Sequence, residues 1–158
     1  MRPFLPEGPD GIGRVDAEVS GSGPRVFDAS LQPACDLFAL EIVRPFEAWM
    51  VLGRTGESVP EIKFADLGLA PAKEYDVFEF WTKRLIGSFS GSFFPGPLDP
   101  HFRCQALVIR ERKPDPQVLA TSRHVTGGGV DLADVRWAGG KLSGTSRVVA
   151  GETPTSSI

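Results

Sequence analysis

Cysteine and histidine are scarce in this sequence of 158 residues, which contains two of each. Cys35 and Cys104 lie far apart, and neither has another Cys or His at the short spacing that zinc ligands show. We therefore predict no metal ion and no other cofactor. One long-range disulfide would be compatible with the sequence, but we favour two buried free thiols, because free cysteine packs as a small apolar side chain.

Long apolar runs are absent, and none approaches the roughly 20 residues of a membrane-spanning helix. The first residues, MRPFLPEGPDGIG, lack the apolar stretch of a signal peptide. We expect no contact with a membrane and no export, and hence a cytoplasmic protein if the chain is complete.

An excess of basic charge is absent too. The net charge is −3, and 17 Lys and Arg residues are scattered among 20 Asp and Glu residues. This argues against a nucleic-acid-binding face, which neutralises phosphates with clustered basic side chains. The small basic cluster RERK, at 110–113, is interpreted as a solvated turn between strands.

Helical periodicity is missing, since no window keeps an amphipathic spacing past two turns without Gly or Pro. The 18 glycines and 14 prolines instead separate short apolar runs, as is typical of an all-β fold. The length suits one domain. We predict an extended or flexible N-terminal arm over 1–24, a β-sandwich domain over 25–151 and a flexible tail over 152–158.

We expect this domain to be an antiparallel, Greek-key-like sandwich, or a barrel, of about eight or nine strands. Residues 102–111 are apolar on both faces, which predicts a central, covered strand. Alternation in YDVFEFW should place Tyr75, Val77, Glu79 and Trp81 on one side. The strand candidates are 37–44 and 48–54, which PFE joins as a hairpin, then 58–69, 75–81, 84–93 and 102–111, and a closing hairpin over 133–149 that turns at AGG.

The stretch LATSRHVTGGGVDL, at 119–132, looks most like chemistry. Ser122 and His124, two apart, would share one face of a strand. A nucleophile also needs an orienting carboxylate, and the strained G-x-S-x-G elbow that commonly carries a serine nucleophile is absent, so we favour a structural histidine. No lysine or helix follows the three glycines, so we favour a bend over a phosphate loop.

Two pairs of carboxylates could suggest glycoside hydrolysis, Asp131 with Asp134 and Glu74 with Asp76. We interpret all four as solvated turn acids.

Three tryptophans could stack on sugar rings if exposed, although a partly buried core position is the commoner role in a small β domain. They are Trp49, Trp81 and Trp137.

Two longer segments resemble a known family. Residues 66–81 read DLGLAPAKEYDVFEFW, residues 116–137 read PQVLATSRHVTGGGVDLADVRW, and LSGTSRVV follows. They are similar to the C-terminal all-β domain of α-galactosidases and related glycoside hydrolases, over about 13–151. Relatives usually carry an asparagine after the W-x-V strand, where this chain reads GRTGE.

The resemblance implies that the catalytic carboxylates lie in a preceding (β/α)₈ barrel, which this chain lacks, so no catalytic residue is carried over. It implies a non-catalytic accessory domain that partners or stabilises such a barrel. Without the barrel, an apolar patch would be exposed, and the chain would tend to form homo-oligomers. We expect Arg123 or His124 to tie its strand to the neighbouring strands.

Two alternatives remain. The first is a carbohydrate-binding module, whose candidate binding residues are Trp49, Trp81, Trp137, Arg123 and His124. The second is an enzyme in its own right, in which His124 would line a pocket with Ser122 and an acid.

Overall fold

The structure is a computed structural model that describes residues 12–17, 37–44, 47–55, 61–147 and 156–157. Cys35 and most of the predicted N-terminal arm and C-terminal tail therefore lie outside the described residues.

Every regular element in the described part is a strand, which confirms the all-β prediction. Eight strands have six residues or more. The strands are β1 (Ile12–Ala17), β2 (Leu37–Arg44), β3 (Glu47–Arg54), β4 (Ile62–Lys63), β5 (Glu74–Glu79), β6 (Arg84–Ser90), β7 (Ser92–Phe93), β8 (Gln105–Glu111), β9 (Ala120–Thr121), β10 (Leu132–Ala138), β11 (Lys141–Ser146) and β12 (Ser156–Ser157).

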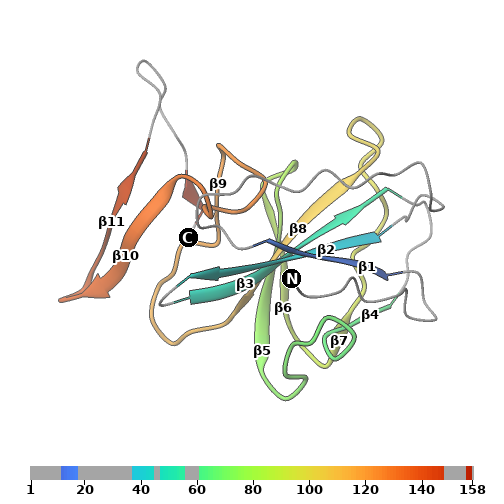
Figure 1. The fold of residues 1–158 in the computed structure, drawn as a ribbon, viewed down its shortest axis with the longest axis horizontal. Coiled ribbons are helices and arrows are strands. Elements are labelled where there is room, and N and C mark those ends of the chain that lie inside the picture. Colours follow the sequence, from blue (N-terminus) through green and yellow to red (C-terminus); the bar gives the residue numbers. More distant parts are fainter. Residues whose placement is uncertain (1–11, 18–36, 45–46, 56–60, 148–155, 158) are drawn as a thin grey trace.

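Six strands form one sheet in the order β1-β2-β3-β8-β5-β6 (Figure 1). The sheet is antiparallel except at β1, which lies within the predicted N-terminal arm and pairs parallel with β2. Its two edges do not meet, so the described strands form an open layered fold and not a closed barrel. As predicted, β8 is central, and all its residues except Glu111 are buried.

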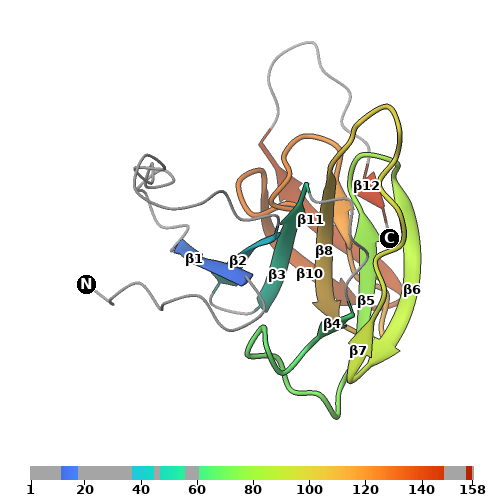
Figure 2. The ribbon, with the colours of Figure 1, turned by 90° about the vertical axis from the view of Figure 1, so that its right-hand side faces the viewer.

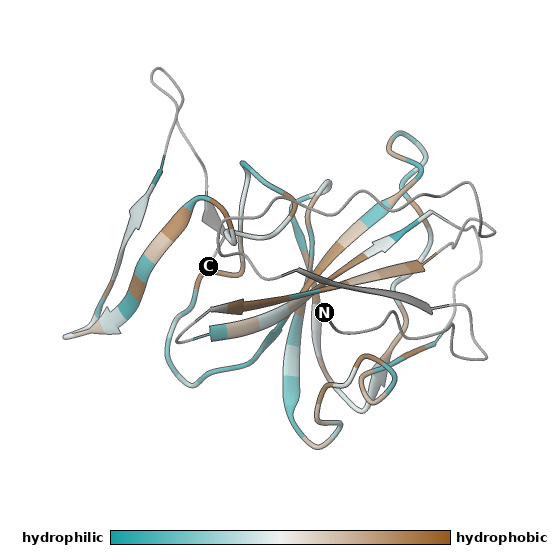
Figure 3. Ribbon diagram, viewed as in Figure 1, coloured by the Kyte–Doolittle hydropathy of each residue, from teal (hydrophilic) through white to brown (hydrophobic). Residues whose placement is uncertain are grey.

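Both faces of the sheet carry apolar side chains, concentrated along the central strands (Figure 3). The first face is covered by residues 61–69 with β7, and the second by residues 118–131, which we call the covering segment (Figure 2). The first core contains Leu37, Ala39, Met50, Leu52, Tyr75, Val77, Leu107 and Ile109 below Ile62, Phe64, Leu67 and Phe93. The second contains Ile42, Trp49, Val51, Phe78 and Val108 below Leu119 and Ala120.

The alternation expected along 75–81 holds within β5, which places Tyr75 and Val77 in the first core and Phe78 in the second. The β-bulge opposite this strand falls on β6, and β5 ends at Glu79, before Trp81. The Glu79 side chain is buried, and its carboxylate accepts hydrogen bonds from the backbone N–H groups of Trp81 and Ala106, at 3.2 and 3.3 Å. Glu79 is therefore a structural acid that fixes the turn carrying Trp81.

Strands β10 and β11 form the predicted hairpin, which stands to one side of the main sheet (Figure 1). Its turn contains Gly139 and Gly140 with φ of +59° and +75°, a conformation that glycine adopts without strain. The register shifts between Ala133 and Arg136, where Asp134 has φ of +54°. This shift positions one wall of the site described next.

Candidate functional site

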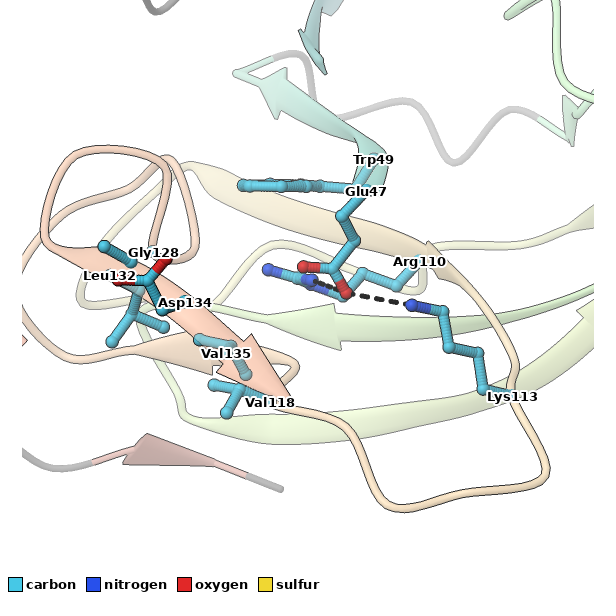
Figure 4. Close-up of a pocket in the computed structure, with 10 residues that line it drawn as sticks. Glu47, Trp49, Arg110, Lys113, Val118, Gly128, Leu132, Asp134 and Val135 are labelled. Carbon is cyan, nitrogen blue, oxygen red and sulfur yellow. Dashed lines mark hydrogen bonds and ion pairs between the residues drawn. The ribbon is translucent and has the colours of Figure 1, made fainter. Parts of the chain in front are cut away.

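A cavity of about 80 Å³ lies between the end of β8, the start of β3 and the chain around the covering segment (Figure 4). It is lined by Glu47, Trp49, Arg110, Lys113, Val118, Gly128, Leu132, Ala133, Asp134 and Val135.

Arg110 is the central side chain of the site, and it is 5% exposed. Its guanidinium stacks over the ring of Trp49, 4.1 Å from the centroid, and pairs with the Glu47 carboxylate at 3.0 Å. Nε donates to the carbonyl of Leu119 at 3.1 Å, and Nη2 donates to that of Gly127 at 3.2 Å. Arg110 thus binds the covering segment at two points, and the interpretation of RERK as a solvated turn is wrong for this residue.

Trp49 makes a third connection, because its indole Nε1 donates to the Thr126 carbonyl at 2.8 Å. The glycines beside it form the bend: Gly127 and Gly128 have φ of +67° and +112°. A Cβ on Gly127 would lie 3.0 Å from Val108 in the core. These glycines therefore serve a bend packed tightly against the sheet.

Ser122 and His124 are both exposed. The Nδ1 atom of His124 accepts the backbone N–H of Thr126 at 3.2 Å and lies 3.0 Å from the Thr126 hydroxyl. These contacts stay within the covering segment. Arg123 is half-buried. Arg110 and Trp49 both reach from the sheet to the covering segment.

The four acids differ in their surroundings. Asp131 is buried, and neither carboxylate oxygen has a hydrogen-bond partner among the described residues, so its interpretation as a solvated acid is wrong. Asp134 is exposed on the cavity wall. Glu74 and Asp76 lie elsewhere, on β5, where both carboxylates face Arg112 at 3.5 and 4.0 Å.

The three tryptophans lie on three parts of the fold. Trp49 is buried in the second core, Trp81 is 38% exposed at the turn after β5, and Trp137 is 37% exposed on the β10–β11 hairpin. Trp81 stacks on Phe102, with centroids 5.8 Å apart and planes at 23°, and Phe80 packs edge-on against it.

Trp81 belongs to a larger apolar surface at one end of the second face. Phe38 pairs with Gly53, Gly53 pairs with Ala106, and the Ala106 carbonyl accepts the N–H of Phe80. Phe38 is 43% exposed at this end, and Leu85 is 53% exposed on the same face. We call this surface the aromatic end; it consists of Phe38, Phe80, Trp81, Leu85 and Phe102.

A second buried arginine supports the loop that carries Phe102. Arg54 donates from Nε to the Gln105 amide oxygen at 3.0 Å and from Nη2 to the Gly96 carbonyl at 2.6 Å. Burial lowers the pKa of Arg54 from its ordinary value.

At the surface, the hydrogen bond from Lys73 to Glu111 raises the pKa of Lys73.

Comparison with known proteins gives no match to a family model, to a curated protein or to a solved structure. In the part of the chain that the structure describes, no three Cys, His, Asp or Glu side chains form a metal-binding group. No helix there is long and apolar enough to cross a membrane. The resemblance to a glycoside hydrolase domain stays a prediction from the segments 66–81 and 116–137.

The sequence reasoning missed Arg110 and Glu47 as members of the site. A signal was present, because Arg110 continues the alternation of Ala106 and Val108 within a strand whose two faces were both predicted to be covered. A charged residue at such a position must be paired or hydrogen-bonded to carbonyl groups.

Proposed function

We propose that this chain is a non-catalytic accessory module of a glycoside hydrolase, which packs on a catalytic barrel and stabilises it. The proposal rests on the contacts made by the covering segment, which contains the SRH and GGG sequences. Its carbonyls accept hydrogen bonds from Arg110 and Trp49, and His124 is hydrogen-bonded to Thr126. This supports a structural role for the segment that most resembles an active site.

The aromatic end is the surface that such a barrel would cover. Large apolar side chains are exposed there, whereas the central strands are covered by residues 61–69 with β7 on one face and by the covering segment on the other. Burying apolar surface is worth about 25 cal/mol per Å², and aromatic side chains in particular anchor interfaces.

The test uses a (β/α)₈ barrel of the α-galactosidase type that lacks its own C-terminal domain. At about 100 times the dissociation constant, the chain should stabilise the barrel by about 2.7 kcal/mol, or roughly 5 to 10 °C in melting temperature. The double variant Trp81→Ala with Phe102→Ala should bind about 30-fold more weakly.

Trp137→Ala is the matched control, since Trp137 is equally exposed but lies on the β10–β11 hairpin. A barrel whose melting temperature stays unchanged, or an equal loss of binding with Trp137→Ala, would contradict the proposal.

A specific observation also favours a second function, that of a carbohydrate-binding module. Trp81 and Phe102 are stacked and exposed, so they offer flat apolar rings to a sugar. Titration with galactosides and related oligosaccharides, followed by heteronuclear NMR, tests this function. Localised shifts at the Trp81 indole would support it, and no shift at millimolar ligand would leave the barrel as the occupant of the aromatic end.

A further inference from the structure

The cavity in Figure 4 has two chemically different walls. One wall belongs to β3, β8 and the chain just after β8, and it carries the ionic side chains of Glu47, Arg110 and Lys113. The other wall is largely apolar, and Val118, Leu132 and Val135 contribute to it. A ligand that fits between them has a polar edge and an apolar side.

Charge in the cavity is balanced. Glu47 bridges the two cations, at 3.0 Å from Arg110 and 3.1 Å from Lys113, and Asp134 supplies a second carboxylate. Two cations therefore face two anions, so neither a strongly anionic nor a cationic ligand is favoured. Because N–H donors and carboxylate acceptors are both present, the complementary groups on a ligand are hydroxyls, which both donate and accept.

Asp134 is the carboxylate that the register shift of β10 places on the cavity wall. It adopts φ of +54° at the register shift of β10, a conformation that costs a non-glycine residue about 1 kcal/mol or more. No hydrogen bond or ion pair within the described residues offsets this cost. The carboxylate of Asp134, which has no partner among the described residues, therefore lies on the cavity wall opposite Glu47.

The size of the cavity limits the ligand. About 80 Å³ is roughly half the volume of an apolar cavity of about 150 Å³ that takes benzene. The cavity therefore holds one edge of a six-membered ring. Lys113 and Asp134 are exposed at its mouth, so the remainder of a ligand can extend into solvent.

We propose that this cavity binds a neutral polyhydroxylated ring, such as the terminal residue of a saccharide. Asp134 and Glu47 accept hydrogen bonds from its hydroxyls, Lys113 donates to it, and Val118 and Val135 contact its C–H groups. The cavity shares no residue with the aromatic end, so a saccharide bound here is a second site, and its binding is measured separately from both functions proposed above.

The experiment is an NMR titration with methyl glucoside, methyl galactoside, methyl mannoside and myo-inositol as probes, and with acetate as an anionic control. The chain has three tryptophans, so three indole N–H signals report separately on the cavity (Trp49), the aromatic end (Trp81) and the hairpin (Trp137). We expect a saturable shift of the Trp49 signal with at least one neutral probe and none with acetate.

Asp134→Gly is the decisive variant, because glycine adopts the positive φ freely while the carboxylate is lost. Binding should weaken about tenfold or more, whereas the melting temperature should not fall. Asp115→Gly removes another exposed carboxylate, outside the cavity, and should bind as the wild type does. Lys113→Met, which removes an exposed donor, should weaken binding without unfolding the chain.

Three results would overturn the proposal: no shift of the Trp49 signal with any neutral probe, unchanged affinity in Asp134→Gly, or shifts confined to Trp81. The last result would at the same time support the carbohydrate-binding function of the aromatic end. The outcome of the barrel experiment has no bearing on these readouts.

Discussion

Replacing Arg110 by methionine is expected to lower the free energy of unfolding by about 3 kcal/mol. Methionine keeps the aliphatic bulk above Trp49 but removes the hydrogen bonds to the carbonyls of Leu119 and Gly127. A buried carbonyl left without a donor costs about 1–3 kcal/mol. Glu47 retains its ion pair with Lys113, so the lost pair adds less.

Urea denaturation measures this loss as a lower midpoint at an unchanged slope. Arg112→Met is the matched control two positions along the chain. Among the described residues, the half-exposed Arg112 side chain pairs with Glu74, Asp76 and Ser88, so its loss should cost less than about 1 kcal/mol. Equal midpoints for the two variants would show that Arg110 does not hold the covering segment in place.

A comparable effect is expected for Gly127→Ala, again about 3 kcal/mol. Alanine at φ of +67° costs roughly 1–2 kcal/mol, and its Cβ would approach both methyl groups of Val108 to 3.0 and 3.1 Å. Val108 is buried and branched at Cβ, so it cannot turn away, and overpacking of this kind costs about 1–3 kcal/mol.

Gly139→Ala separates the two contributions. Gly139 has a similar φ, +59°, but an added Cβ would meet no atom within 4 Å. Its replacement should therefore cost only the backbone part, about 1 kcal/mol. Thermal and urea unfolding of both variants give the difference directly, and equal losses would mean that the contact with Val108 is unimportant.

The sequence predicted the central part of the fold well. Residues 37–44 form β2 as expected, and the two apolar faces of 102–111 correctly indicated that β8 lies inside the sheet. These predictions succeeded because alternation along a strand depends only on local spacing. The closing hairpin was also predicted correctly, because Gly139 and Gly140 specify its turn locally.

The site was harder to predict, because it depends on which loop covers which face. Asp131 is near glycines and looks solvated in the sequence, yet packing of the covering segment buries it. Arg110 looks like part of a basic surface cluster until the same segment closes over it. Long-range packing, which local patterns do not encode, decides each case.

The position of β8 between β3 and β5 has a consequence for how the chain acquires its fold. Strands β2 and β3 are neighbours in sequence, as are β5 and β6, so each pair forms locally. The two pairs meet only through β8, which is made after both of them. During synthesis β3 and β5 therefore each present an open edge until residue 111 has left the ribosome. Such edges invite pairing between chains, and late insertion of a central strand is a slow step in folding.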